Sequence, residues 1–347
     1  MEKNTFTFID LFAGIGGFRL ALEELGGKCV YTSEWDKSAS ETYKANFGDY
    51  PDGDITKVRE MDIPEHDVVC AGFPCQSFSI SGKQKGFEDT RGTLFFDVLR
   101  IVTFHKPKVL FLENVKNFAK HDNGNTLKVV LNALKQAGYS TYYKVLNASY
   151  YGAITSRERV YILAFKKDLQ INSFDFPQPQ ISRGCIKDIL EEKVNKKYNI
   201  VRDDIFLRNQ NSQELFFSKY SKPIQIGHIN KGGQGERIYS EFGHAITLSA
   251  HGGGAAAKTG AYLIDGVVRK LTPRECARIM GFPDSFVIPV SDAQAYKQFG
   301  NSVAVPVLKS IFSKVIHIPN IWQQNIDIQQ TLDQVLQREV LEMNMML

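Results

Sequence analysis

The stretch FTFIDLFAGIGGFRLALEEL, residues 6–25, decides the fold that the sequence predicts. It begins with a short run of aromatic and branched residues, passes through a glycine-rich turn, and continues with helical spacing. This order of strand, glycine turn and helix is typical of the first unit of a doubly wound α/β fold. A dinucleotide fingerprint needs a third glycine at position 19, but Arg19 stands there, which disfavours a nicotinamide oxidoreductase.

Alternating strands and helices continue to about residue 165. Strands are predicted at 28–33, 68–71 and 109–112, and helices at 37–47 and 94–105. Continuous apolar strands that alternate with helices predict a parallel sheet covered on both faces. The expected fold class is therefore α/β, with a Rossmann-like, mostly parallel, doubly wound sheet.

After about residue 181 the sequence becomes polar and rich in glycine, which predicts a smaller, loop-rich second domain that contains short strands. A length of 347 residues suits two domains. We place the catalytic and cofactor domain at 1–183, the second domain at 184–272, a hinge at 273–300, and a return to the first domain at 301–347. An apolar helical stripe at 328–343 is expected to pack on its own domain.

The composition is that of an ordinary globular protein, with 43% hydrophobic and 23% charged residues. No apolar run is long enough to span a membrane, and residues 1–5 do not begin a leader sequence. Five cysteines without dense spacing argue against a disulfide scaffold and for a reducing compartment. We therefore expect a cytoplasmic protein with no membrane partner.

The net charge of +4 is concentrated in one segment. Residues 222–280 hold eight Lys and Arg residues against four Asp and Glu residues, an excess equal to that of the whole chain. A modest basic surface suits the phosphate backbone of a nucleic acid. An ordinary solvated surface explains the same charge equally well.

Polar groups follow the predicted strands one after another. The glycine turn follows the first strand, Glu34 the second, Cys75 the third and Glu113 the fourth. Ligands of open parallel sheets bind beyond the carboxyl ends of the strands, so these groups are expected to line one crevice. There Glu34 suits the hydroxyls of a ribose, and Trp35 suits stacking on an adenine ring.

Cys75 is the candidate nucleophile. It precedes a long polar stretch, residues 76–93, of the kind that forms lids or binding loops. A thiolate is strongly nucleophilic, and a buried carboxyl such as Glu113 becomes a proton donor, although a lone acid more often caps a helix. His66, Cys70 and Cys75 lack a fourth ligand at zinc spacing, so no metal is expected.

Five short motifs occur in a fixed order: FAGIGG at 12–17, PCQ at 74–76, ENV at 113–115, RER at 157–159 and GNSV at 300–303. Together they resemble the motifs of the DNA (cytosine-5) methyltransferases, and the resemblance covers nearly all of residues 5–315. It implies that Cys75 adds to C6 of cytosine, that Glu113 protonates N3, that Arg159 holds O2, and that Arg157 supports the site. An exposed strand face is the alternative for the two arginines.

The resemblance also implies S-adenosylmethionine as cofactor. The residues expected to bind it are Phe12, Gly14, Gly17, Glu34, Trp35, Asp54, Ile55, Pro74, Leu94 and Asn301. Asn301 is also a residue type that commonly caps the N-terminus of a helix, here before Val303. Cofactor binding and helix capping by Asn301 are compatible.

Because C6 is buried in stacked DNA, the target base must leave the duplex. The loops at 232–237 and 245–250 resemble the target-recognition loops of a family member that reads GCGC, which predicts methylation of the inner cytosine of that site. The expected DNA contacts are Ser81, Gln234, Arg237, Thr247 and Gly254.

The expected partners are double-stranded DNA, which places the protein at the bacterial nucleoid, and a cognate restriction endonuclease that forms no stable complex with this chain. We expect a monomer. One alternative is a tRNA cytosine-5 methyltransferase, whose relatives carry a Cys-Phe-Thr tripeptide that is absent here. Another is an inactive DNA-binding homologue, which the presence of Cys75 and Glu113 disfavours.

Overall fold

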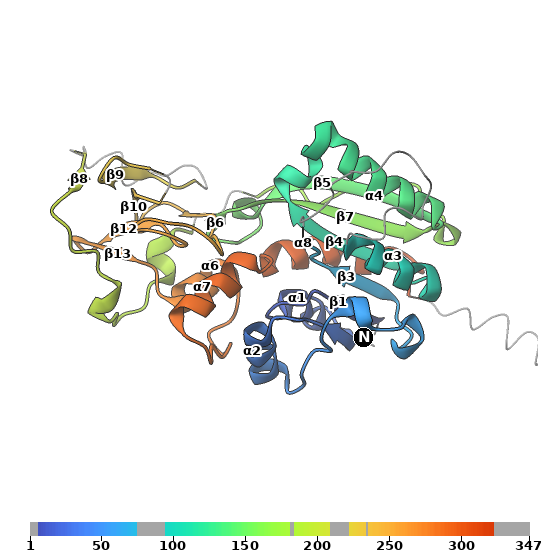
Figure 1. Cartoon of the computed structure of the whole chain (residues 1–347). Coiled ribbons are helices and arrows are strands. Elements are labelled where there is room, and N and C mark those ends of the chain that lie inside the picture. Colours follow the sequence, from blue (N-terminus) through green and yellow to red (C-terminus); the bar gives the residue numbers. More distant parts are fainter. Residues whose placement is uncertain (1–5, 75–93, 181–183, 209–221, 234, 323–347) are drawn as a thin grey trace, which may run out of the picture.

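A computed structural model describes residues 6–74, 94–180, 184–208, 222–233 and 235–322. Its main sheet has six strands in the order β2-β1-β3-β4-β7-β5, and only β7 runs antiparallel to its neighbours (Figure 1). The strands are β1 Phe6–Leu11, β2 Gly27–Ser33, β3 Val68–Ala71, β4 Val109–Val115, β5 Tyr139–Asn147 and β7 Glu158–Lys166. The predicted α/β class with a mostly parallel sheet is confirmed.

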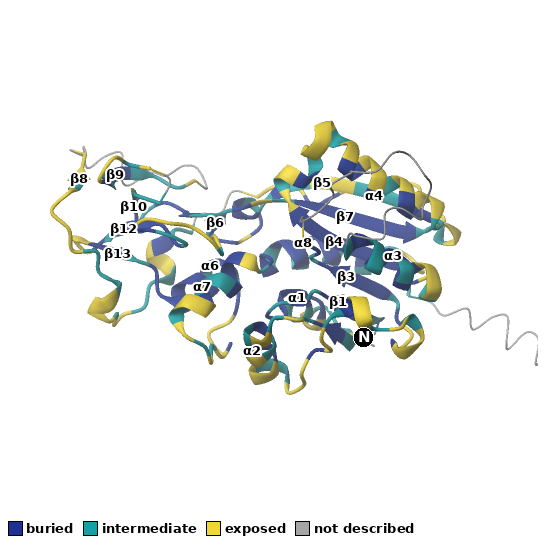
Figure 2. Cartoon of the chain, viewed as in Figure 1, coloured by how far each residue is buried: buried dark blue, intermediate teal, exposed yellow. Residues whose placement is uncertain are grey.

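Helices cover both faces of this sheet: α1 Gly17–Glu24 and α8 Val305–Ile316 on one face, and α3 Leu94–His105 and α4 Asn125–Gln136 on the other. The other helices are α2 Lys37–Phe47, α6 Pro273–Ile279 and α7 Asp292–Asn301, of which α6 and α7 lie to the left of the main sheet in Figure 1. Residues of α1 and α8 share one apolar cluster with Phe8 and Phe111, whereas α3 and α4 share a second cluster with Ile9 and Leu110. Neighbouring strand residues point to opposite faces, so the sheet is buried on both sides (Figure 2).

A second, smaller sheet has five strands in the order β13-β12-β10-β9-β8 and lies at the left of Figure 1. Its strands are β8 Ile205–Leu207, β9 Gln225–Ile229, β10 Arg237–Ser240, β12 Ala261–Ile264 and β13 Val267–Lys270. A two-stranded sheet joins the two regions, because β6 Thr155–Ser156 pairs in parallel with β11 Ala245–Ile246.

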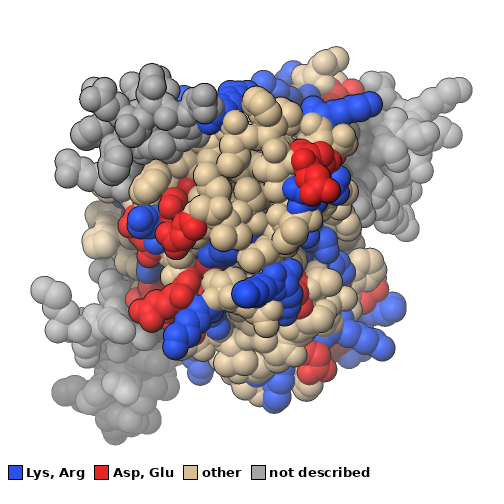
Figure 3. All heavy atoms as spheres, turned by 90° about the vertical axis from the view of Figure 1, so that its left-hand side faces the viewer, with Lys and Arg blue, Asp and Glu red and all other residues tan. Residues whose placement is uncertain are grey.

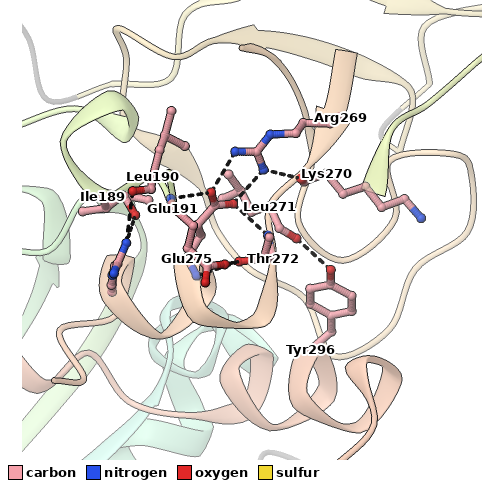
Figure 4. Close-up of polar contacts among 10 residues, drawn as sticks. Ile189, Leu190, Glu191, Arg269, Lys270, Leu271, Thr272, Glu275 and Tyr296 are labelled. Carbon is pink, nitrogen blue, oxygen red and sulfur yellow. Dashed lines mark hydrogen bonds and ion pairs between the residues drawn. The ribbon is translucent and has the colours of Figure 1, made fainter. Parts of the chain in front are cut away.

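A buried ion pair fixes the end of the second sheet to α6 (Figure 4). Arg269 of β13 donates to both carboxylate oxygens of Glu275 at 2.8 and 2.7 Å, and Glu275 is fully buried. The same carboxylate accepts from the amide of Thr272, the N-cap of α6, and from the amide of Glu191. Pairing and hydrogen bonding of this kind are what a buried charge requires.

This pair also corrects the interpretation of the basic segment at 222–280. Arg269 pairs with Glu275, and Arg278 pairs with Asp284. Arg274 donates to the carbonyls of Pro283 and Phe286. These three arginines therefore stabilise the fold, and their donors bind groups of the protein itself. In the described part of the chain, no helix has the length and apolar character needed to cross a membrane.

We predict that His66 makes the fold sensitive to acid. Burial lowers the pKa of His66 to about 4, so the folded protein resists protonation that the unfolded chain accepts near its ordinary value. Stability is therefore lost as the pH falls from about 6.5 toward 4. Between pH 7 and pH 5, the wild type should lose about 2 kcal/mol more unfolding free energy than His66→Gln in urea titrations.

The exposed His317 supplies the control, because His317→Gln should lose stability with pH as the wild type does. Parallel curves for the wild type and His66→Gln would contradict the assignment.

Candidate active site

The glycine turn after β1 needs left-handed backbone at three positions. Phe12, Gly14 and Gly16 have φ of 58°, 57° and 83°. A Cβ at Gly16 would lie 2.2 Å from the Phe47 ring, and one at Gly17 would lie 2.5 Å from Val303. A Cβ at Gly14 would meet nothing within 4 Å, so the turn is tightly packed behind and open in front.

Glu34 closes this turn from the end of β2. Its carboxylate accepts from the amide of Gly14 at 2.8 Å and from the amide of Asp36 at 2.7 Å. Burial raises the pKa of Glu34, and these two amides oppose the rise. Trp35 beside it is 77% exposed, which leaves the indole face open to an aromatic ligand.

The remaining predicted cofactor residues surround the same edge of the sheet. Asp54 caps a short 3-10 helix in which Ile55 is buried, and Leu94 begins α3. Pro74 is exposed just beyond β3. Asn301 is the exposed last residue of α7, so the alternative in which it caps the next helix is wrong; Ala304 occupies that position.

Glu113 lies inside β4 and is 8% exposed. Arg159 Nε approaches Glu113 Oε1 to 3.1 Å, yet this oxygen has no hydrogen-bond partner among the described residues. Burial raises the pKa of Glu113, while Arg159 and Arg157 act to lower it. The helix-capping alternative is wrong for Glu113, because it is a strand residue whose carboxyl retains capacity to bind a ligand.

Asn114 has a role that the sequence analysis missed. Its side-chain amide donates to the Phe73 carbonyl at 2.8 Å, and its oxygen accepts from the Val115 amide. This fixes the backbone that leads to Pro74 against the end of β4. Cys75 itself lies outside the described residues.

Arg157 joins three segments of the chain. Its guanidinium donates to the carbonyls of Leu248, Gly300 and Ser302 at 3.4, 3.2 and 2.6 Å, and the residue is only 2% exposed. Burial, followed by the charge of Arg159, lowers its pKa. The exposed strand face is therefore wrong for Arg157, and the Arg159 side chain is only 14% exposed.

Residues 246–247, at the end of β11, are held against β6 by two hydrogen bonds. Thr155 Oγ1 donates to the Ile246 carbonyl at 3.0 Å, and Thr247 Oγ1 donates to the Ser156 carbonyl. A Cβ at Gly300 would lie 2.4 Å from the amide nitrogen of Ala250, so the two backbones nearly touch. Thr247, a predicted DNA contact, is thus tied to β6, which directly precedes β7 of the main sheet.

The other predicted DNA contacts lie on the second sheet or outside the description. Arg237 begins β10 and is exposed. Gly254 has φ of 97° and packs against the Gly235 backbone. Ser81 and Gln234 lie outside the described residues. Seen from this end of the molecule, basic and acidic side chains are interspersed around a broad uncharged area (Figure 3).

The described residues contain no group of three or more His, Cys, Asp or Glu side chains arranged to hold a metal ion.

The doubly wound sheet carries a glycine turn, an acid after β2 and a buried carboxyl on β4 at the carboxyl ends of its strands, which is where such sheets bind ligands. Residues 6–317 match the family of C-5 cytosine-specific DNA methylases, and the chain belongs to this family. It is a DNA (cytosine-5) methyltransferase that uses S-adenosylmethionine as methyl donor.

Individual relatives agree with this assignment. The chain is 58% identical over 305 residues to the type II methyltransferase M.HhaI of Haemophilus parahaemolyticus, covering 88% of this chain and 92% of that protein. It is 47% identical over 329 residues to M.HpaII of Haemophilus parainfluenzae, covering 90% of each. A solved DNMT2 mutant from Spodoptera frugiperda shares the fold, with a TM-score of 0.67 at 21% identity, covering 90% of this chain and 100% of that one.

We predict that Gly300→Ala destabilises the protein despite the higher helix propensity of alanine. The added methyl group meets backbone atoms of Ser249 and Ala250, which cannot rotate away as a side chain does. Urea unfolding should show a loss of about 1–3 kcal/mol, as for other overpacked sites. Gly53→Ala is the control, because its Cβ meets nothing within 4 Å; equal stability of the two variants would contradict the close approach.

Proposed function

We propose that this protein methylates C5 of the inner cytosine of GCGC in duplex DNA, as the modification enzyme of a bacterial type II restriction-modification system. The observation that carries the chemistry is the buried carboxyl of Glu113, which has a raised pKa, an unused oxygen and Arg159 at 3.1 Å. This arrangement suits recognition of the N3 and O2 edge of a cytosine that has left the DNA stack.

The proposed reaction begins with addition of the Cys75 thiolate to C6, which breaks the C5=C6 double bond. Glu113 gives its proton to N3 and thereby takes up the negative charge that the addition creates. Arg159 binds O2 and keeps the Glu113 carboxyl in place. After C5 has taken the methyl group and the neutral thioether S-adenosylhomocysteine is left, the C5 proton goes to a base. Expulsion of the Cys75 thiolate and return of the N3 proton to Glu113 then restore the aromatic ring and the starting state of the acid.

The residues around the glycine turn fit S-adenosylmethionine. Glu34 retains lone pairs for ribose hydroxyls, Trp35 offers an exposed aromatic face, and the front of Gly14 is open. The cofactor supplies an electrophilic methyl group on its sulfonium. We propose that Phe12, Gly17, Asp54, Ile55, Pro74, Leu94 and Asn301 complete this site.

We propose that residues 184–272 form the target-recognition domain, with 273–300 as the hinge and 301–347 returning to the catalytic domain of 1–183. The GCGC assignment rests on the resemblance of the loops at 232–237 and 245–250 to those of a GCGC-reading relative. Arg237, Gln234, Thr247, Gly254 and Ser81 are the proposed DNA contacts, since Arg reads guanine and Gln reads an opened pair.

In this proposal the enzyme acts as a monomer in the bacterial cytoplasm, where its substrate places it at the nucleoid. The cognate endonuclease reads the same site independently and forms no stable complex with this chain.

We predict that Glu113→Gln lowers kcat by about 100-fold or more, because a carboxamide cannot give a proton to N3. Burial keeps Glu113 protonated to a higher pH than an ordinary glutamate, and the wild-type rate should fall as the pH rises through this raised pKa. The variant should lack that decline. Titration with S-adenosylhomocysteine should show unchanged binding, which separates lost chemistry from a damaged fold.

Bisulfite sequencing of DNA from a host that expresses the protein tests substrate, position and specificity together. We predict protection from bisulfite conversion at the inner cytosine of GCGC, lost in Cys75→Ser. Modification at another sequence would overturn only the GCGC assignment. Radiolabelled transfer to tRNA instead of DNA would favour a tRNA methyltransferase, and no transfer to either would favour an inactive DNA-binding homologue.

A further inference from the structure

Helix α7 is bonded to the element that carries Glu34 and Trp35. Lys297 Nζ lies 2.6 Å from Asp36 Oδ2, and Asp36 is the N-cap of α2 through its other oxygen, which accepts from the Ala39 amide at 3.0 Å. The Asp36 amide donates to Glu34. Lys297 therefore begins a chain of bonds that runs from α7 through Asp36 to the Glu34 carboxylate.

Gln298 forms a second link one residue further along α7. Its side-chain amide donates to the Ser38 carbonyl at 2.8 Å, and its oxygen accepts from Thr42 Oγ1 at 2.9 Å. Gln298 is 7% exposed and Thr42 is fully buried. Both ends of the first two turns of α2 are thus fixed from α7.

Helix α7 is itself anchored on its far side. Tyr296 donates to the Leu271 carbonyl at 2.7 Å (Figure 4), and Asp292 pairs with Lys197 at 2.7 Å. At the carboxyl end of the helix, Arg157 binds the carbonyls of Gly300 and Ser302. The helix is a fixed support, whereas the turn at 34–36 ends an edge strand and presents an exposed Trp35.

We propose that Lys297 and Gln298 are positioning residues for S-adenosylmethionine, which act through Asp36, Ser38 and Thr42 on the turn that carries Glu34 and Trp35. This inference rests on the proposed cofactor site. Neither residue touches the reacting atoms. Their loss should therefore weaken binding of the cofactor without changing the chemical step at saturating cofactor.

The test measures the Kd of S-adenosylhomocysteine by calorimetry on the full chain, together with the KM for S-adenosylmethionine and kcat on DNA. Lys297→Met should raise both Kd and KM about threefold, as loss of a partly exposed ion pair allows. Gln298→Leu, which removes both of its buried hydrogen bonds to α2, should raise them about tenfold. In both variants kcat should stay within twofold of the wild type.

Lys297→Arg should restore near-normal affinity, because a guanidinium also pairs with Asp36. Asp36→Asn keeps an N-cap side chain and removes the ion pair, so combining it with Lys297→Met should raise Kd no further than either change alone. If the effects of Asp36→Asn and Lys297→Met on Kd add in this double-mutant cycle, Lys297 does not act through Asp36 and the inference is overturned.

Lys197→Met is the matched control. It removes an ion pair of similar length, 2.7 Å, from the other end of α7, where Tyr198 also donates to Asp292. It should leave the Kd of S-adenosylhomocysteine unchanged. An equal rise in Lys197→Met and Lys297→Met would indicate general loosening of α7 and overturn the inference. If the wild type itself fails to bind S-adenosylhomocysteine, the proposed cofactor site fails; if all variants bind alike, only this inference fails.

Discussion

The buried guanidinium of Arg157 is the contact that ties the main sheet to the loop after β11 and to the end of α7. Its two terminal nitrogens donate to the backbone carbonyls of Leu248, Gly300 and Ser302, which belong to segments about 90 and 145 positions away in the chain. A charge removed from water must be bonded in this way, and each carbonyl is bonded in turn. Arg157 therefore fixes the loop after β11, the end of α7 and the start of the strand that carries Arg159.

Close backbone contact completes what Arg157 begins. Gly300 packs against the backbone of Ser249 and Ala250 because it has no side chain. The hydroxyls of Thr155 and Thr247 each donate a hydrogen bond across the pair of strands β6 and β11. Glu113 then sits in the central part of a sheet covered on both faces, where burial raises the pKa of its carboxyl. Burial of the central strands therefore both stabilises the sheet and raises the pKa of Glu113.

Local patterns in the sequence predicted the elements well because periodicity and glycine placement act over short distances. The helices at 37–47 and 94–105 have the predicted bounds, and Glu34 lies where the order of strands placed it. Long-range pairing was not predictable in this way. Asn114, Lys297 and Gln298 look like ordinary polar residues until folding brings Phe73 and α2 beside them. The net charge of residues 222–280 was a poor guide to a DNA-binding surface, because the charge count does not show that Arg269 is paired with Glu275 in the folded protein.

The chain has two tryptophans, and the structure separates them. Trp322 stacks on Phe6 with ring centroids 4.8 Å apart, at the amino edge of the main sheet, whereas Trp35 stands 77% exposed beyond the carboxyl end of β2. An indole in water emits at longer wavelength than one enclosed by aromatic rings. The protein therefore contains its own optical probe: a blue shift or quenching on addition of an adenine nucleoside arises at Trp35, while Trp322 supplies a constant background.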